Sequence, residues 1–276
     1  MYRTWLVGLL VAAGAGCVGG CGGHYLLTVP DQIAPVGGET VTVVRLQRND
    51  FFVLAQPVDE AAIQFRIEGG PVRGAYTDKL GYAAAAVPVP DAAGRASLTA
   101  SHIDYYGDEV QQAADVYVWD RDRPVIAVDM DCLPGLWLGS SEDAARALRR
   151  LVVGANLLYL TRRSARHHAG AHETLTKAGY PRGPILTWQR ERWHIVRDEK
   201  MLRLPRIVVE SRLVSQLPEV RKVFPRLTAG VCDSSLAAKA FAEAGMTVVM
   251  VGGASADEAA DVVRRDSWAD LAAQGP

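Results

Sequence analysis

Four polar side chains stand where predicted strands end. Asp129 and Asp131 follow one apolar run, Thr161 ends a second run, and Asp233 closes a later one. The carboxyl ends of parallel strands meet at one edge of a sheet, where open α/β folds bind their ligands. We therefore expect these groups to meet over one crevice, where carboxylates can bind a divalent cation or act as nucleophiles.

The segment after Arg123 supplies the elements that must position these side chains. Apolar runs alternate there with amphipathic helical stretches, which is the pattern of a parallel α/β sheet. The runs cover residues 125–128, 157–160, 185–186, 227–231 and 247–251. A helix is predicted over residues 141–153 with Ser141 as its cap, and another over 237–244 with Gly245 as its terminator.

This arrangement resembles the haloacid dehalogenase (HAD) superfamily in three motifs. The family's hydrophobic strand followed by Asp-x-Asp is matched by Asp129-Met130-Asp131, its strand ending in Thr or Ser by Leu-Leu-Tyr-Leu-Thr161, and its late acidic motif by Ala-Gly-Val-Cys-Asp233. The segment from Gly179 to Leu186 is similar to one in the lipin and actin-patch phosphatidate phosphatases. The resemblance implies a HAD-like Rossmannoid parallel sheet flanked by helices over residues 123–276.

The resemblance also implies a magnesium-dependent phosphomonoester hydrolase with an aspartyl-phosphate intermediate. Asp129 would be the nucleophile and Asp131 the general acid and base, while the Thr161 hydroxyl would bind a phosphoryl oxygen. Mg²⁺ would be held by Asp129, by the backbone carbonyl of Asp131 and by the carboxylate of Asp233. Because the chain leaves no room for a lid domain between the first two motifs, the substrate would be phosphatidate or another large phosphorylated molecule.

The motifs depart from the family pattern at several positions. Cys132 and Leu133 follow the second aspartate where other residues are usual, and a second acidic residue is missing from the last motif. The substrate-binding lysine of the family has Arg212 as its best counterpart, with Lys200 and Lys222 as alternatives. The alternative function is therefore a catalytically degenerate envelope lipoprotein that binds a partner or ligand without turnover.

Two residue pairs leave further alternatives open. Cys132 and Cys232 each adjoin a motif aspartate on strands that this fold places side by side, so they form either a disulfide or two free thiols near the site. His168 and His172 have a spacing that can bind zinc on a helix. Since no third ligand stands near them in the sequence, we expect surface histidines.

Residues 22–122 have the short strands and the turn signals between them that are typical of an all-β module. Ile63, Phe65 and Ile67 alternate with polar residues, which predicts a strand with one apolar face. The turn Thr77-Asp78-Lys79-Leu80-Gly81 is similar to one in bacterial immunoglobulin-like (Ig-like) domains. The resemblance implies an Ig-like β-sandwich that serves as a spacer or docking unit, and the sequence does not identify its protein partner.

Residues 1–21 read as a signal peptide with a lipobox. Arg3 precedes an apolar run from Trp5 to Ala15 that is too short to span a bilayer. The small residues before Cys17 and Cys21 resemble the lipidation site of a bacterial lipoprotein, with Cys21 or Cys17 as the modified residue. The expected location is the periplasm or cell envelope, with a lipid anchor in the membrane; the alternative is an ordinary cleaved signal.

The charge balance bears on partners. The chain has 30 basic and 31 acidic residues, so nothing in its composition indicates a nucleic-acid partner. Arginine, lysine and tryptophan residues gather between 188 and 206. This stretch suits either an anionic lipid headgroup or a solvated loop.

Overall fold

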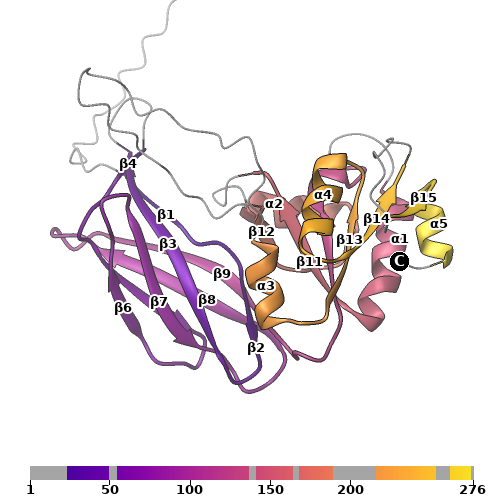
Figure 1. Cartoon of the computed structure of the whole chain (residues 1–276). Coiled ribbons are helices and arrows are strands. Elements are labelled where there is room, and N and C mark those ends of the chain that lie inside the picture. Colours follow the sequence, from indigo (N-terminus) through magenta and orange to yellow (C-terminus); the bar gives the residue numbers. More distant parts are fainter. Residues whose placement is uncertain are drawn as a thin grey trace, which may run out of the picture.

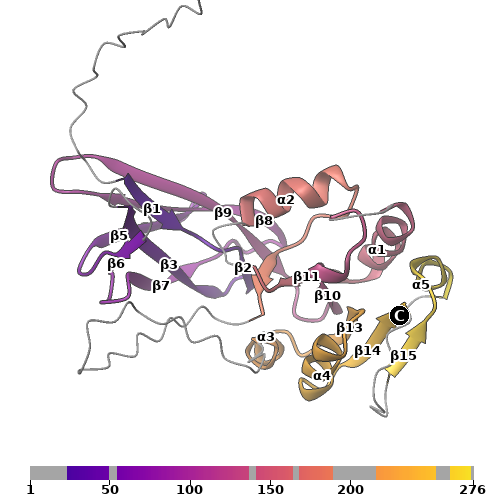
Figure 2. The ribbon, with the colours of Figure 1, turned by 90° about the horizontal axis from the view of Figure 1, so that it is seen from above.

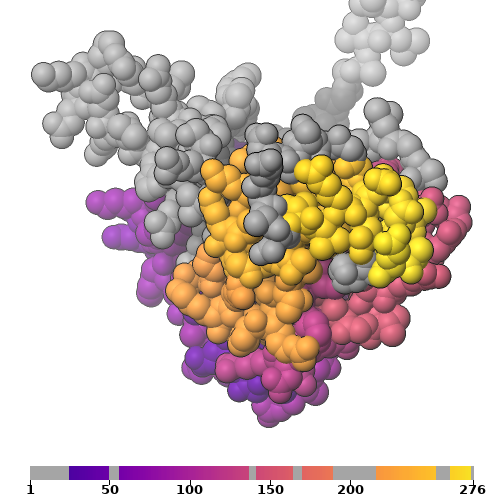
Figure 3. Space-filling model, turned by 45° about the vertical axis from the view of Figure 1, so that its right-hand side comes forward, coloured from indigo at the N-terminus to yellow at the C-terminus, as the bar shows by residue number. Residues whose placement is uncertain are grey.

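The computed structural model describes residues 24–49, 55–136, 141–163, 168–188, 216–252 and 262–274. The chain forms an N-terminal β domain and a C-terminal α/β part that lie side by side (Figure 1). In the space-filling view, the orange and yellow C-terminal part covers the front and the β domain lies behind it (Figure 3). In the described part of the chain, no helix has the length and apolar character needed to cross a bilayer.

The β domain contains two sheets that share one core. The first sheet is formed by β1 (His24–Thr28), β3 (Glu39–Asn49), β4 (Ala55–Pro57) and β7 (Tyr82–Pro88). The second has the order β2-β9-β8-β5-β6 and is formed by β2 (Gln32–Pro35), β5 (Ala62–Ile67), β6 (Arg73–Tyr76), β8 (Gly94–Ile103) and β9 (Glu109–Trp119). Ile63, Phe65 and Ile67 are buried in this core while their neighbours are exposed, so the predicted alternation is confirmed.

The α/β part is built on a six-stranded parallel sheet of order β12-β11-β10-β13-β14-β15. Its strands are β10 (Val125–Asp129), β11 (Asn156–Thr161), β12 (Ile185–Thr187), β13 (Leu227–Cys232), β14 (Thr247–Val251) and β15 (Val262–Arg265). All five predicted apolar runs are strands, and β15 is an addition. The strands of this sheet pair in parallel, so the predicted parallel α/β sheet is confirmed.

Helices cover both faces of this sheet (Figure 2). They are α1 (Glu142–Gly154), α2 (His168–Lys177), α3 (Leu217–Val223), α4 (Ser235–Glu243) and α5 (Trp268–Gln274), with a 3₁₀ turn, η1 (Met130–Cys132). Ser141 occupies the predicted N-cap position of α1, but its hydroxyl donates to the carbonyl of Ala178 and makes no capping hydrogen bond to the helix. Gly245 follows α4 with a φ of 70°, as expected of a helix terminator.

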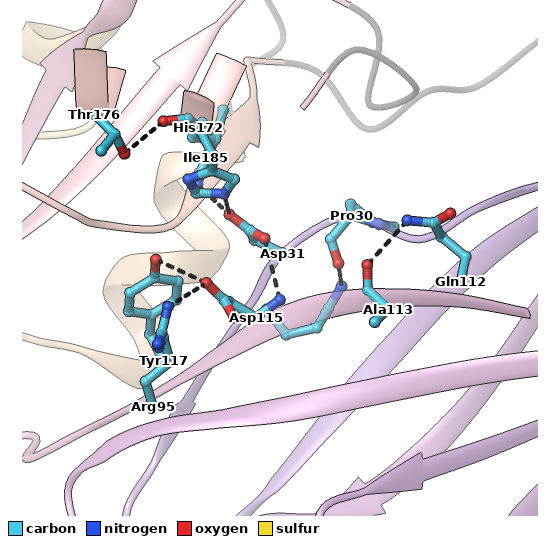
Figure 4. A network of polar contacts seen from close by, with 11 residues as sticks. Pro30, Asp31, Arg95, Gln112, Ala113, Asp115, Tyr117, His172, Thr176 and Ile185 are labelled. Atoms are coloured by element: carbon cyan, nitrogen blue, oxygen red, sulfur yellow. Dashed lines mark hydrogen bonds and ion pairs between the residues drawn. The ribbon is translucent and has the colours of Figure 1, made fainter. Parts of the chain in front are cut away.

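The buried carboxylate of Asp31 joins the β domain to the α/β part (Figure 4). Its Oδ2 lies 2.7 Å from Nε2 of His172 on α2 and accepts a 2.8 Å hydrogen bond from the backbone N–H of Ile185 on β12. Its Oδ1 accepts a 3.4 Å bond from the backbone N–H of Asp115 on β9. The expectation that His172 is a surface histidine is therefore wrong, and the side chain of His168 lies outside the described residues.

The His172–Asp31 contact predicts a pH-dependent stability. Burial lowers the pKa of His172, but the hydrogen bond to Asp31 and the charges of Asp31 and Asp115 outweigh this effect and raise the pKa overall. A raised histidine pKa adds stability below the ordinary value and loses it as pH rises through the native value. We expect His172→Ala to lower the free energy of unfolding by about 1.5–3 kcal/mol at pH 5.5, and by less at pH 9.

Urea unfolding at both pH values measures this difference. His172→Gln is the matched control, because its amide can still donate to Asp31 but does not titrate in this range. A loss of stability in His172→Ala that is the same at pH 5.5 and pH 9 would contradict the contribution of a protonated imidazole.

Close packing of α4 on β13 generates a second stability prediction. A Cβ added at Gly230 would overlap three ring carbons of the buried Phe241. Because the ring of Phe241 is rigid and buried, Gly230→Ala is expected to destabilise the protein by about 1–3 kcal/mol. Urea unfolding of Gly230→Ala, Phe241→Leu and the double variant measures this effect; the two changes should be less than additive, and strict additivity would argue against the clash.

Candidate functional site

Three neighbouring strands bring the predicted site residues to one edge of the sheet. Asp129 is the last residue of β10, and Thr161 is the last residue of β11. Asp129 pairs in register with Leu160, so Thr161 lies one residue beyond it on the adjacent strand. β13 pairs with β10 on the other side and is followed directly by Asp233. The predicted convergence at the carboxyl edge is therefore present in the order and direction of the strands.

A set of short contacts fixes the Asp131 carboxylate within η1. Its Oδ1 accepts a 3.1 Å hydrogen bond from the Thr161 hydroxyl, and its Oδ2 accepts a 3.2 Å bond from the backbone N–H of Arg162. The backbone N–H of Asp131 donates to Oδ1 of Asp129 at 3.2 Å. Asp131 thus contacts both Asp129 and Thr161, and the Thr161 hydroxyl donates to a carboxylate of the protein itself.

Sequence reasoning missed Arg162, although its guanidinium lies in the middle of this group. Its Nη2 lies 3.5 Å from Oδ2 of Asp129, and its Nε lies 3.8 Å from Oδ2 of Asp131. Nη2 also donates to the hydroxyl of Ser234 at 3.3 Å. The signal in the sequence was a basic residue directly after Thr161, at the edge where two carboxylates were already expected.

Burial perturbs the carboxyl group of Asp129. Its side chain is 1% exposed, and burial, followed by the negative charge of Asp131, raises its pKa to about 6. The hydrogen bond from the Asp131 backbone and the charge of Arg162 oppose this rise. Asp129 is therefore a carboxyl group that is ionised near neutral pH in spite of a buried position beside a second carboxylate.

The family resemblance implies a Mg²⁺ ion at this edge of the sheet. The carboxylates of Asp129 and Asp233 and the backbone carbonyl of Asp131, which the resemblance implies as ligands, are hard oxygen donors of the kind that Mg²⁺ prefers. The guanidinium of Arg162, however, bridges Asp129 and Asp131, which is where a shared cation would sit. Within the described ranges, no group of three or more His, Cys, Asp or Glu side chains is placed to hold a metal ion. As arranged, these side chains do not fit Mg²⁺. The magnesium site implied by the resemblance stays a prediction.

The two cysteines beside the motif aspartates are free thiols. Burial raises the pKa of both, and the charges of Asp129 and Asp233 add to the rise; the pKa of Cys232 reaches about 12. Both thiols are therefore protonated at neutral pH and are poor nucleophiles. Of the two alternatives for this pair, the structure has the free thiols.

Other predicted site residues are not part of the described cluster. Arg212, Lys200, Cys17 and Cys21 lie outside the described residues. Lys222 pairs with Glu219 on its own helix, at 2.8 Å. From the basic and aromatic stretch between 188 and 206, the structure describes Trp188, which is buried in the core under α3 and α4; the rest of that stretch is outside the described ranges.

Comparisons with known proteins assign no family. No family model matches the chain, and no curated protein matches it. Among solved structures, the chain is similar to the D0-D1 domain of intimin (15% identity, 34% of this chain and 47% of that chain, TM-score 0.25). It is also similar to the tandem Ig repeats of Dlar (14%, 40% and 60%, 0.27) and to a 2,6-sialyltransferase of Vibrionaceae Photobacterium sp. JT-ISH-224 (11%, 80% and 41%, 0.23).

The chain spans about half of the length of the intimin structure and 60% of the Dlar structure. Ig domains are thus among the neighbours of a strand-rich chain that also contains a parallel sheet. These TM-scores are too low to support an argument about function.

The raised pKa of Asp129 predicts that the site lowers the stability of the fold at neutral pH. A raised carboxyl pKa means that the native state holds the proton more tightly, so stability is lost as pH rises from the ordinary value of 3.8 through about 6. Asp129→Asn removes this loss and should stabilise the protein at pH 8 by up to about 3 kcal/mol. At pH 4 the variant should differ little from the wild type.

Urea unfolding of wild type and Asp129→Asn at pH 4 and pH 8 measures this effect. Asp91→Asn, at an exposed carboxylate of the β domain, serves as the matched control. An Asp129→Asn variant that is less stable than wild type at pH 8 would show that the ionised carboxylate stabilises the fold.

Proposed function

We propose that the chain hydrolyses phosphomonoesters at the carboxyl edge of β10 and β11, with Asp129 as the nucleophile. The observation that supports this proposal is that Asp131 contacts Asp129 and Thr161 while the guanidinium of Arg162 lies beside both carboxylates. A nucleophilic carboxylate, a second carboxylate for proton transfer and a fixed positive charge are the groups that phosphoryl transfer requires.

The proposed reaction has two steps. In the first, Oδ2 of Asp129 attacks phosphorus, the bond from phosphorus to the ester oxygen breaks, and protonated Asp131 gives its proton to the leaving oxygen. In the second, water attacks the aspartyl-phosphate, Asp131 takes a proton from this water, and phosphate leaves Asp129. The Thr161 hydroxyl and the Arg162 backbone N–H donate to the two oxygens of Asp131, which orients this carboxylate beside Asp129 and suits the proton-accepting second step.

The same proposal includes a HAD-like fold for the α/β part, an Ig-like fold for the β domain and a lipid anchor at Cys21 or Cys17. The parallel order β11-β10-β13, with Asp129 on the central strand, supports the HAD-like reading. The anchor would place the enzyme at the membrane face of the periplasm or cell envelope. A membrane-anchored site suits phosphatidate or another large phosphorylated substrate.

Ligand binding without turnover is a second candidate, and one observation favours it. Oδ2 of Asp129 faces the guanidinium of Arg162 at 3.5 Å, and the Thr161 hydroxyl is engaged with Asp131. A nucleophile held by an ion pair attacks poorly unless the substrate displaces that pair. A site that keeps these contacts when a phosphorylated ligand binds would hold the ligand and leave it intact.

Hydrolysis of p-nitrophenyl phosphate, measured from pH 5 to pH 9 with and without MgCl₂, separates the two candidates. We expect turnover in the wild type and a fall of about 10³-fold or more in Asp129→Asn, because the substitution removes the nucleophile. Asp91→Asn should retain the wild-type rate. If wild type and Asp129→Asn are equally inert over a panel of phosphomonoesters, the binding function is correct; if both turn over equally, Asp129 is not the nucleophile.

A further inference from the structure

Arg162 ties together three segments at the carboxyl edge of the sheet. It follows β11 directly, its guanidinium bridges the carboxylates after β10, and its Nη2 donates to Ser234 after β13. Ser234 is itself fixed, because its hydroxyl accepts a hydrogen bond from the backbone N–H of Ala237 as the N-cap of α4. The guanidinium is therefore held by partners from three positions along the chain.

The charges around Arg162 explain why a cation belongs there. Asp129 and Asp131 are close enough for the charge of one to raise the pKa of the other, and Asp129 is buried. Two neighbouring carboxylates without a cation repel each other and any anionic ligand. Arg162 supplies this cation from within the chain, and a guanidinium keeps its charge at every pH at which proteins are folded.

The guanidinium also has hydrogen-bonding capacity for a ligand. Its contacts with the described residues use Nε and Nη2, and its side chain is 44% exposed. A guanidinium presents five N–H donors in a planar fork that matches two oxygens of a phosphoryl group. The Nη1 side can therefore donate to phosphoryl oxygens while Nη2 stays beside Asp129.

We infer that Arg162 is the resident cation of this site and binds the phosphoryl group of its ligand without a divalent metal. The inference rests on the proposed function, because it assumes a phosphorylated ligand at this edge of the sheet. It follows from the disagreement between the Mg²⁺ that the family resemblance implies and the guanidinium that bridges Asp129 and Asp131. Removal of Arg162 should leave the two carboxylates without their cation and open the position to a divalent ion.

Isothermal titration of the folded full chain with MgCl₂ tests the occupied cation position. We expect Arg162→Ala to bind Mg²⁺ at least 10-fold more tightly than the wild type. Arg162→Gln, which keeps the side-chain length and removes the charge, should behave like Arg162→Ala. Arg146→Ala is the matched control, since Arg146 pairs with Glu142 and Asp143 on α1, and it should bind Mg²⁺ as the wild type does.

Titration with inorganic phosphate in the presence of EDTA tests the metal-free ligand. The wild type and Arg146→Ala should bind phosphate, and Arg162→Ala and Arg162→Gln should bind it at least 10-fold more weakly. Circular dichroism confirms that each variant is folded, which the exposure of Arg162 leads us to expect. Equal Mg²⁺ affinity in the wild type and both Arg162 variants, or phosphate binding that EDTA abolishes in the wild type, would overturn the inference.

The outcomes of these titrations can be distinguished from a failure of the proposed hydrolase function. If the titrations follow the expected pattern but the wild type hydrolyses no phosphomonoester, Arg162 is the resident cation of a binding site and the hydrolase proposal fails. If the wild type turns over p-nitrophenyl phosphate and Asp129→Asn does not, but Mg²⁺ binds the wild type and Arg162→Ala equally, the hydrolase proposal stands and the resident cation is rejected.

Discussion

Two carboxylates held side by side at the end of a buried strand are the constraint on which the site depends. Asp129 cannot move away from Asp131, because it ends a strand that is buried along its whole length and its Oδ1 accepts the Asp131 backbone N–H. Such a pair needs a positive charge or a proton. The guanidinium of Arg162 and the raised pKa of Asp129 are the two responses that the structure contains.

The β domain contacts the same sheet at β12, which is an outer strand of the sheet. Asp31 accepts the backbone N–H of Ile185 on β12, and β12 pairs with β11, which ends in Thr161. A buried carboxylate without partners would be unstable, so Asp31 and His172 stabilise each other only when the two parts of the chain are together. The β domain is thus attached to the strand next to the one that carries Thr161.

Much of this architecture could be predicted from the sequence. The buried parallel strands are continuous apolar runs, and apolar and polar residues alternate along β5. β15 could not be predicted, since two of its four residues are arginines. The strand-end rule placed Asp129, Asp131 and Thr161 correctly. The side chain of Arg162 escaped prediction because its direction depends on Ser234, 72 residues away, and the Asp31–His172 pair spans 141 residues with no periodic signal.

A crystal structure of the protein soaked in MgCl₂ tests most directly whether the Arg162 guanidinium keeps its position in the presence of a competing metal. We expect the guanidinium within ion-pair distance of both Asp129 and Asp131, and no ion between these carboxylates. An octahedral ion bound by Asp129, Asp131 and Asp233, with Arg162 turned away from them, would contradict this expectation.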